Sequence, residues 1–339
     1  MATYDFIFDG LGLRGWCGES GGGTMSMQDL IAKRSGEAPS VWETPFPSLD
    51  NLHDACPAIA QTRQLTTGLE NGFLGMKDSL KFVLDPITQP LSWFLSGALN
   101  LFQTVPWFIM IPALLIVVFL ASRSSRLVVT VATMILFLAF IDHYDYAMQT
   151  LAIIFVCSAI CVLLGVPIGI AMSRSDRLQK SVIPILDMLQ TLPPFVYLIP
   201  LIFLFSVTEP KLYGIAIILY AIVPVIRLTD LGIRLVDKDV IEAADAFGMT
   251  DRQKLYGVQI PLALPNIMAG VNQTIMMSLA MVVIASLVSA PGLGVLVLRG
   301  IRNLELGVGL VSGLGIVLLA IILDRVTKAA LARVNTAQQ

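Results

Sequence analysis

Seven long apolar stretches recur along this 339-residue sequence, each nearly free of charged side chains. A helix needs about 20 consecutive apolar residues to cross the hydrocarbon core of a bilayer, and a soluble domain rarely contains several such stretches. Charged residues make up only 14% of the chain, against about 25% in soluble domains. The stretches therefore predict an all-α integral membrane protein, a polytopic bundle of about seven spans.

Two of the predicted spans are irregular. The second is short but uncharged, and the fourth contains Pro193-Pro194 and Pro200. We place the seven spans at Val105–Ala121, Leu127–Ile141, Met148–Met172, Val182–Phe205, Leu212–Ile226, Ile267–Val288 and Gly307–Leu323.

The charges between the spans predict the orientation of the chain. Lys and Arg follow the first, third, fifth and seventh spans, whereas the turns after the second and fourth, Asp142–Asp145 and Glu209–Lys211, are poorer in them. Because cytoplasmic loops are enriched in Lys and Arg, we predict an N-terminus outside and a cytoplasmic C-terminus. The turn after the sixth span carries Arg299 and Arg302 and fits this alternation less well.

The first 85 residues differ from the rest because they are rich in glycine, serine, proline and acids. Their apolar side chains are too sparse to offset the entropy of ordering, so we predict an acidic, weakly structured extracytoplasmic tail. Met1–Gly12 lacks the basic region and long apolar core of a signal peptide. Cys17 and Cys56 would lie in an oxidising space, where a disulfide between them is one hypothesis.

The stretch Leu91–Gln103 is amphipathic but, at about 13 residues, short for a span. We therefore predict an interfacial helix, with the front of the first span as the alternative. The predicted division is an acidic tail (1–85), an interfacial helix (86–104), two peripheral spans (105–146), a transmembrane core (147–325) with a cytoplasmic loop (228–265), and a cytoplasmic tail (326–339).

Several classes of site are not expected in this chain. The sequence has no G-x-x-x-x-G-K-[ST] motif, so ATP and Mg²⁺ would have to be bound by another subunit, and we expect no cofactor here. Two histidines and four scattered cysteines predict no metal centre, and the absence of a basic block gives no sign of a nucleic-acid partner. Cys157 and Cys161 are predicted to be small apolar residues at a helix contact.

A polar island, Asp239–Pro265, separates the fifth and sixth spans. Asp239 with Glu242 three residues later is typical of a helix start, and Thr250–Gln253 is typical of a capping box. Gly248, between them, can take the positive φ that ends a helix. The island therefore predicts a helix, a tight turn and a second helix outside the bilayer.

The first helix of this island has a face that a partner could approach closely because it contains alanines. That face consists of Val240, Ala243, Ala244 and Phe247. The strings Glu242–Ala244, Gly248 and Val258–Pro261 resemble the EAA–G–I-x-L-P loop of the membrane subunits of bacterial ABC importers, with V-x-I-P as a departure. The alternative is an ordinary amphipathic helix between spans. The resemblance implies coupling to an ATPase through Glu242, Ala243, Ala244, Phe247, Gly248 and Pro261.

Polar side chains at membrane depth in the fourth and sixth spans predict a translocation path. The double proline must break the fourth span near Leu192, and such breaks are tolerated only against protein or a water-filled cavity. The alternative is hydrogen bonding that only holds helices together. Asp187, an acid within a span, is expected to pair with Arg227. The predicted lining residues are Met188, Gln190, Thr191, Pro193, Pro194, Phe195 and Tyr197, with Asn272, Gln273 and Met276.

Three longer strings, Asp187–Leu198, Met268–Ser286 and Gly315–Arg325, resemble the glycine betaine/proline permeases of osmoprotectant ABC importers. The resemblance extends over approximately residues 90–330. It implies a type I ABC importer membrane fold of the MetI type in a bacterial cytoplasmic membrane, and a transport subunit rather than an enzyme. It also implies a homodimer that works with two ATPase subunits and an extracytoplasmic substrate-binding protein.

The same resemblance implies small quaternary-amine or zwitterionic cargo such as glycine betaine, proline betaine, choline, carnitine or trimethylamine N-oxide. A methylated ammonium is held best by aromatic faces, and that cage would belong to the binding protein. Phe195, Tyr197 and Tyr220 are the aromatic candidates in this chain. Three alternatives stay open: an ion-gradient-driven secondary transporter, a membrane sensor or scaffold, and an ABC permease for another small amino acid.

Overall fold

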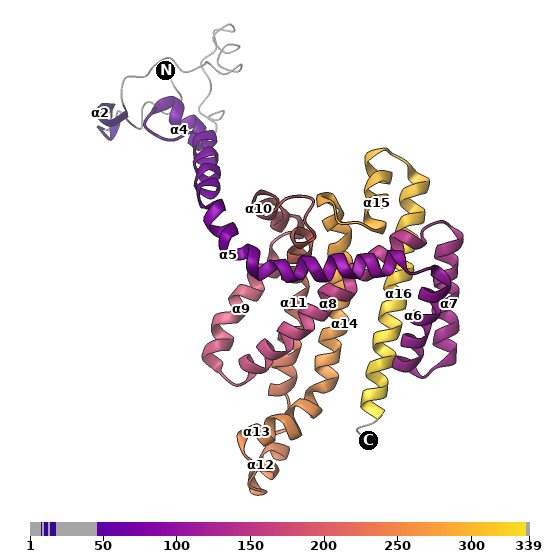
Figure 1. The fold of residues 1–339 in the computed structure, drawn as a ribbon. Coiled ribbons are helices and arrows are strands. Elements are labelled where there is room, and N and C mark those ends of the chain that lie inside the picture. Colours follow the sequence, from indigo (N-terminus) through magenta and orange to yellow (C-terminus); the bar gives the residue numbers. More distant parts are fainter. Residues whose placement is uncertain (1–7, 9, 13, 18–45, 337–339) are drawn as a thin grey trace. The chain divides into compact units, whose positions relative to one another are not determined.

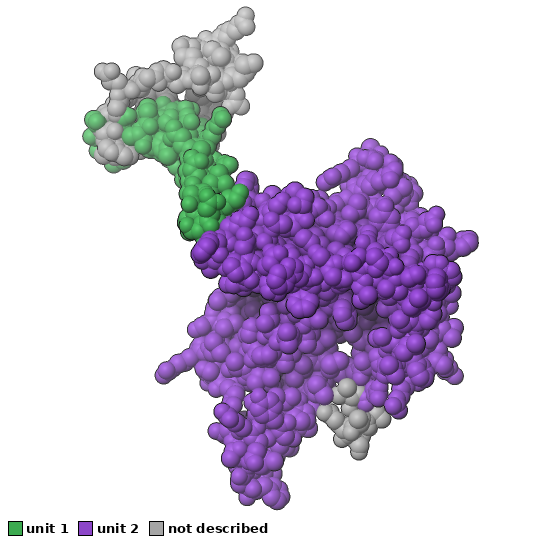
Figure 2. Space-filling view, in the orientation of Figure 1, with its two compact units in different colours: residues 1–80 green, residues 81–339 purple. Residues whose placement is uncertain are grey.

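The computed structural model describes residues 8, 10–12, 14–17 and 46–336. Every regular element among them is helical, and the chain divides into two compact units, residues 1–80 and 81–339 (Figure 2). The helices are α2 (Arg14–Cys17), α4 (Leu49–Ala55), α5 (Thr62–Thr104), α6 (Trp107–Ser122), α7 (Ser125–Phe140), α8 (Tyr144–Ser173), α9 (Asp176–Thr191), η2 (Pro194–Tyr197), α10 (Leu198–Leu204), α11 (Pro210–Arg234), α12 (Lys238–Ala246), α13 (Asp251–Lys254), η3 (Leu255–Gln259), α14 (Ile260–Ala285), η4 (Ser286–Val288), α15 (Leu293–Arg302) and α16 (Leu306–Thr336).

The first unit is built around a small buried cluster. Phe8, Cys17 and Cys56 form its centre, and Leu52 and Ile59 pack against them. Cys17 and Cys56 are joined by a disulfide, which confirms that hypothesis. A cross-link of this kind supplies stability that a short, apolar-poor segment lacks, and the segment next to it forms the local helix α4. The stretch 18–45, which the tail prediction also covered, lies outside the described residues.

Helix α5 corrects the predicted boundary at residue 86. It begins at Thr62 and continues through Pro86 and Pro90, so the expected interfacial helix is only its second half. The sequence from Leu65 to Leu80 has apolar residues three or four apart, a helical period that the polar composition concealed. Within the second unit, α5 runs across the bundle at a steep angle to α8, α11, α14 and α16 (Figure 1). It then turns by 116° into α6.

The predicted apolar stretches are helical except for the break in the fourth and a few residues at their ends. In the part of the chain that the structure describes, four helical segments are long and apolar enough to cross a membrane: α8, α11, the segment from Asp251 to Val288, and α16. Two bent pairs, α5 with α6 and α9 with α10, raise the number to six, and α7 is apolar but shorter. The all-α membrane fold is confirmed, and the number of seven spans stays a prediction.

Helices α8, α11 and α14 pack closely at the centre of the bundle. A Cβ on Gly169 of α8 would lie 2.7 Å from the carbonyl oxygen of Ile226 on α11, and a Cβ on Gly270 of α14 would lie 3.0 Å from the Cα of Val225. Such approaches require glycine. Cys157 and Cys161 are free and buried in α8, as expected for small residues at a helix contact.

The two ends of the bundle carry different connections. The turns after α6 and α8, the α12–α13 loop and the C-terminus lie at one end, which we call the inner end (Figure 1). The turn after α7, together with α10 and α15, lies at the other, which we call the outer end. The turns at the inner end are those predicted to be cytoplasmic from their positive charge.

Helices continue beyond the predicted apolar stretches in three places. Helix α11 runs eight residues past Ile226 and so includes residues 228–234 of the predicted cytoplasmic loop. Helix α13 continues through the π-helical η3 into α14, where Pro261 has no N–H to complete a regular turn. Helix α16 extends to Thr336 and so includes residues 326–336 of the predicted tail; Lys328 and Asp324 form an ion pair one turn apart in it.

Candidate functional site

The α12–α13 loop has the turn chemistry that its sequence predicts. Gly248 takes φ +72° after α12, and Thr250 and Gln253 form a capping box at α13. The predicted helix start at Asp239 is wrong by two residues. Asp237 is the N-cap, and its side chain accepts a hydrogen bond from the backbone N–H of Asp239. Either aspartate satisfies the N-cap preference, so sequence alone does not choose between them.

The predicted partner face of α12 is divided in the structure. Phe247 is 88% exposed and Val240 is 40% exposed, and Ala243 is exposed as well. Ala244, in contrast, is buried within the chain at 6% exposed, and its backbone carbonyl accepts a hydrogen bond from the N–H of Met249. The prediction that both alanines face a partner is therefore wrong for Ala244. Val240, Ala243 and Phe247 thus leave an exposed apolar strip along α12.

The other predicted coupling residues lie at the edges of this surface. Glu242 is exposed on α12, and Pro261 is partly buried in the first turn of α14. The loop's base is an apolar cluster that contains Ile233 of α11, Leu255 of η3 and Ile267 of α14, with Ile170 of α8 packed against it. The segment that follows the α12–α13 loop, η3, is thus packed against three spans at once.

The break in the fourth predicted span is confirmed. Helix α9 ends at Thr191, and Leu192 takes ψ 134° ahead of Pro193, as a residue before proline prefers. The following η2–α10 segment leaves at 103° to α9. The hydroxyl of Tyr197 is buried and donates a hydrogen bond to the carbonyl of Leu189. Tyr197 therefore closes the broken helix end rather than facing a path, which corrects its predicted role.

The remaining path candidates divide into two groups. Five of those from the fourth span are exposed on the surface of the single chain: Met188, Gln190, Thr191, Pro193 and Phe195. Pro194 is partly buried, as are Met276 on α14 and Tyr220 on α11, whereas Gln273 is exposed. Gln190 Nε2 lies 4.0 Å from the sulfur of Met277, which brings α9 and α14 together.

Asn272 takes the alternative role of joining helices. Its amide donates to Asp324 on α16 at 3.2 Å, and its carbonyl accepts from the hydroxyl of Thr327. Its polar group is thus directed to α16 rather than to α9. On the other side of the bundle, Asp187 on α9 pairs with Arg227 on α11, as predicted. Both side chains of this pair are more than a third exposed.

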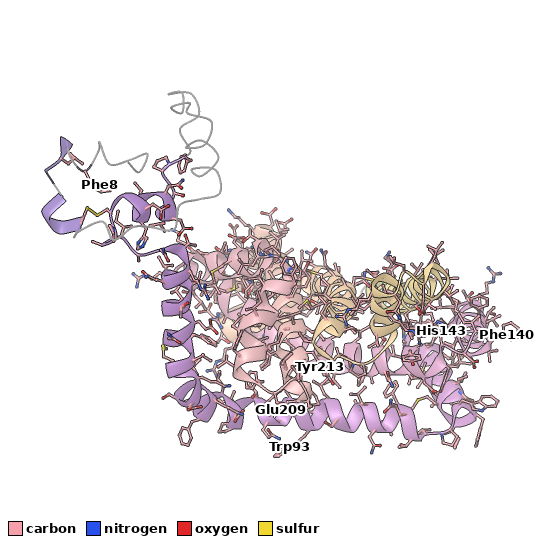
Figure 3. All side chains as sticks on the ribbon, turned by 90° about the horizontal axis from the view of Figure 1, so that it is seen from above. Phe8, Trp93, Phe140, His143, Glu209 and Tyr213 are labelled. Atoms are coloured by element: carbon pink, nitrogen blue, oxygen red, sulfur yellow. A yellow bond between two sulfur atoms is a disulfide. The ribbon has the colours of Figure 1, made fainter. Side chains whose placement is uncertain are left out.

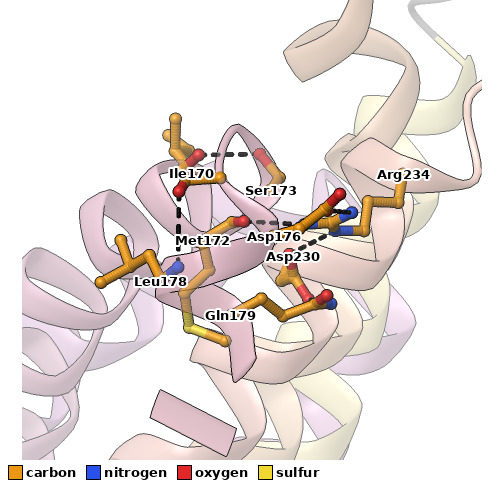
Figure 4. A network of polar contacts seen from close by, with 9 residues as sticks. Ile170, Met172, Ser173, Asp176, Leu178, Gln179, Asp230 and Arg234 are labelled. Carbon is orange, nitrogen blue, oxygen red and sulfur yellow. Dashed lines mark hydrogen bonds and ion pairs between the residues drawn. The ribbon is translucent and has the colours of Figure 1, made fainter. Parts of the chain in front are cut away.

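The sequence interpretation missed a polar cluster at the inner ends of α8, α9 and α11 (Figure 4). Its centre is Asp230, buried at 5% exposure, with Arg234 one turn later on the same helix. An acid and an arginine four residues apart are a signal for a helical pair. The signal was available, but the fifth predicted span ended at Ile226, so these charges were assigned to a solvated loop.

A transverse amphipathic helix, a close-packed membrane bundle and a projecting helix–turn–helix loop together define the membrane subunit of a transporter. The chain belongs to the family of binding-protein-dependent transport system inner membrane components, whose family model matches residues 161–336. It is therefore a permease subunit of an ABC importer, not an enzyme, in the inner membrane. Its family works with an ATPase subunit and a substrate-binding protein.

Two similar relatives are named for betaine transport. The glycine betaine/proline betaine transport system permease protein ProW of Escherichia coli is 39% identical over 297 residues, 87% of this chain and 82% of that protein. The glycine betaine/carnitine transport permease protein GbuB of Listeria monocytogenes is 36% identical over 277 residues, 80% of this chain and 95% of that protein. The trimethylamine N-oxide permease TmoV of Ruegeria pomeroyi is 33% identical over 272 residues, covering 79% of this chain and 40% of TmoV.

The fold is shared with the MetNI methionine ABC transporter in an inward-facing conformation. The superposition covers 57% of this chain and 95% of that one, with a TM-score of 0.51 and 19% sequence identity. At this identity the likeness shows the fold alone. The MetI-type fold and the ABC permease hypothesis are thus confirmed, and the comparisons do not support the ion-gradient alternative.

Proposed function

We propose that this chain forms the membrane pathway of an ATP-driven importer for small methylated zwitterions or quaternary amines, with glycine betaine as the principal candidate. The observation that carries this proposal is the 39% identity over 87% of the chain to a permease named for glycine betaine and proline betaine. Relatives named for carnitine and trimethylamine N-oxide extend the same chemical class. Their cargo has a permanent or formal charge on a methylated nitrogen, surrounded by apolar methyl groups.

The energy enters through the α12–α13 loop. The ATPase, with its ATP and Mg²⁺, is a separate subunit, and the exposed side chains of Glu242, Ala243 and Phe247 supply the surface on which it docks. Closure of two ATPase subunits brings the two copies of α12 together. Because the base of the loop is packed on α8, α11 and α14, this movement changes the tilt of the spans and alternates access between the two sides.

The working unit contains two copies of this chain. The exposed face around the broken helix mixes apolar and polar groups, with Met188 55% and Phe195 53% exposed beside Gln190 and Thr191. Lipid does not satisfy polar side chains, so a second copy is the better partner for this face. The cargo then passes between the two copies and binds weakly, because tight binding on the membrane subunit would slow release. Selection is made by the binding protein.

The proposed orientation has the N-terminus outside and the C-terminus inside. Its support is the clustering of the positively charged turns at the end of the bundle that carries α12 and α13 (Figure 1). The disulfide between Cys17 and Cys56 is a second support, because disulfides persist in oxidising compartments.

The test is uptake by proteoliposomes that contain this chain, its ATPase and its binding protein, with ATP supplied and no ion gradient. Labelled glycine betaine, carnitine, trimethylamine N-oxide and methionine are compared at equal concentration. We expect uptake of one or more methylated amines and none of methionine. Vesicles with an inactive ATPase are the control. Uptake that requires a sodium or proton gradient, or uptake of methionine alone, would contradict the proposal.

A further inference from the structure

The polar cluster at the inner ends of three helices has a geometry that fixes α9 on α11. We call it the inner polar cluster: Asp176 and Gln179 of α9, and Asp230 and Arg234 of α11. Asp230 accepts a hydrogen bond from Gln179 Nε2 at 2.6 Å and one from Arg234 Nε at 3.0 Å. Arg234 also donates to Asp176 Oδ1 at 2.7 Å and to the carbonyl of Met172, at the end of α8, at 2.9 Å (Figure 4).

These contacts tie the helices in a fixed register. A buried carboxylate is tolerated only when its oxygens are hydrogen-bonded or paired, and each oxygen of Asp230 has its own donor, one from α9 and one from α11. The guanidinium of Arg234 is planar and directs its donors at fixed angles. The guanidinium donates hydrogen bonds to three different groups, the carboxylates of Asp176 and Asp230 and the carbonyl of Met172. A shift of α9 along α11 therefore breaks several contacts at once.

The rest of α9 is held less tightly. Leu186 is its one buried side chain among the described residues. It packs in an apolar cluster with Met172, Val223 and Ile226, and three partly buried side chains of α9, Val182, Ile183 and Leu189, pack against that cluster. Asp187 and Arg227 pair farther along the same two helices, but both are partly exposed. The inner polar cluster is therefore the contact that decides where the inner end of α9 goes when α11 moves.

The cluster also adjoins the loop that faces the ATPase. Arg234 is the last residue of α11, and only Leu235–Asp237 separate it from α12. Val236, in the middle of this connection, is buried, so the connection has little freedom to move independently of the two helices. A displacement of α12 therefore moves the end of α11, and with it the side chains of Asp230 and Arg234.

We propose that the inner polar cluster transmits the movement of α12 through the end of α11 to α9, and so to the helix break at Leu192–Pro193. Asp230 and Arg234 are positioning residues in this proposal, since they act through α9 and touch neither cargo nor ATPase. The proposal rests on the proposed function, because it assumes that α12 is driven by an ATPase. It adds a route from that helix to the broken span.

The test compares ATP hydrolysis and solute uptake in the same proteoliposomes for the wild type, Asp230→Asn, Arg234→Gln and Arg234→Lys. Loss of the cluster lowers uptake per ATP hydrolysed by about 3- to 30-fold, the range that a broken coupling contact produces, while ATPase binding is retained. Arg234→Lys keeps one charge but not the three-way geometry, and its loss is intermediate. Arg177→Gln, an exposed substitution on α9, is the matched control and keeps the wild-type ratio.

A distance measurement separates transmission from simple instability. Spin labels on α9 and α12 report whether both helices move when ATP is added. In the wild type both change position, whereas in Arg234→Gln only α12 does. If Asp230→Asn fails to fold, Gln179→Leu takes its place, because it removes one of the two side-chain links between α9 and α11 and leaves the ion pairs of Arg234 intact.

The two proposals fail in different ways. Wild-type vesicles without ATP-dependent uptake would overturn the proposed function and this inference together. Wild-type uptake that is matched, per ATP, by Asp230→Asn, or by both Gln179→Leu and Arg234→Gln where Asp230→Asn does not fold, would overturn the inference alone. Concerted movement of α9 and α12 in Arg234→Gln would do the same.

Discussion

The two ends of helix α11 hold buried charges in different ways. Among the described residues, Lys211 at its outer end and Asp230 near its inner end are the charged side chains that are buried. Lys211 pairs with Asp85 of α5 at 2.6 Å and with Glu209 at 2.8 Å, and it lies 5.1 Å from the ring centroid of Phe205. We call Lys211, Asp85 and Glu209 the outer polar cluster. Glu209 lies beside α5 where α11 begins (Figure 3).

The difference between the two clusters lies in what surrounds them. At the outer end, the backbone N–H of Lys211 also donates to Ser92 of α5, and a Cβ on Gly214 would lie 2.6 Å from Leu95 of the same helix. Charge and close apolar packing therefore act on the same helix pair. At the inner end, Asp176 is 77% exposed, and α9 has little buried surface. The outer polar cluster anchors α11 to α5. The inner polar cluster links α11 to α9, which can move together with α11.

The largest effect is expected at the outer cluster. Lys211→Met removes the cation shared by two carboxylates that are 35% and 32% exposed, and leaving partly buried charged acceptors without their donor costs about 2–3 kcal/mol of unfolding free energy. The measurement is the unfolding transition of the purified chain in detergent. Lys180→Met, an exposed lysine on α9, is the control and shifts stability by no more than about 0.5 kcal/mol. A Lys211→Met chain as stable as the wild type would show that the outer cluster anchors nothing.

A second prediction concerns the docking surface beyond the inner end. Phe247→Ala removes a large exposed apolar side chain and is expected to weaken ATPase binding by about 30-fold, or roughly 2 kcal/mol, as at an interface hot spot. Its unfolding free energy stays near the wild-type value because the ring is 88% exposed.

Leu304→Ala provides the matched control for that measurement. Leu304 is 89% exposed but follows α15 at the outer end, so its loss leaves ATPase binding unchanged. If Phe247→Ala and Leu304→Ala weakened ATPase binding equally, the assignment of ATPase docking to the inner end would be wrong.

The turn chemistry and the helix break were predictable from the sequence because they depend on a few adjacent residues. Gly248, the Thr250–Gln253 capping box and the break at Leu192 each follow from local backbone preferences. The polar clusters depend on which distant side chains meet. Lys211 and Asp230 stand next to apolar stretches, and their sequence neighbours do not distinguish a solvated loop from a buried helix end.

The sequence also predicted poorly the lengths of helices and the exposure of individual side chains. Helix α11 continues past its apolar stretch because Asp230 and Arg234 find partners on α8 and α9, which the composition of the segment does not indicate. Likewise, Ala244 belongs to the predicted partner face by helical spacing, yet it is buried within the chain. Both errors arise from tertiary contacts that override a local pattern.

A third prediction tests whether the inner end acts through its backbone geometry. Gly248 has φ +72°, a conformation that costs a β-branched residue about 1–2 kcal/mol. Gly248→Val is expected to lower uptake per ATP by about 5- to 30-fold while insertion into the membrane is retained. Gly248→Asn is the control, since asparagine tolerates this region, and its loss is smaller. Normal uptake by Gly248→Val vesicles would contradict the coupling role of the loop.

The smallest effect is expected from the second link between α9 and α11, the ion pair of Asp187 with Arg227. Its side chains are 53% and 38% exposed, and pairs of this kind contribute about 0.2–1 kcal/mol. A double-mutant cycle with Asp187→Asn, Arg227→Gln and the combined variant measures the interaction as the departure from additive unfolding free energies. We expect about 0.5 kcal/mol here and a larger coupling between Gln179 and Asp230, because Asp230 is buried. Strictly additive losses would show that the Asp187 pair does not hold α9. If the coupling between Asp187 and Arg227 were larger than that between Gln179 and Asp230, the main contact between α9 and α11 would be this ion pair farther along α9 and not the inner polar cluster.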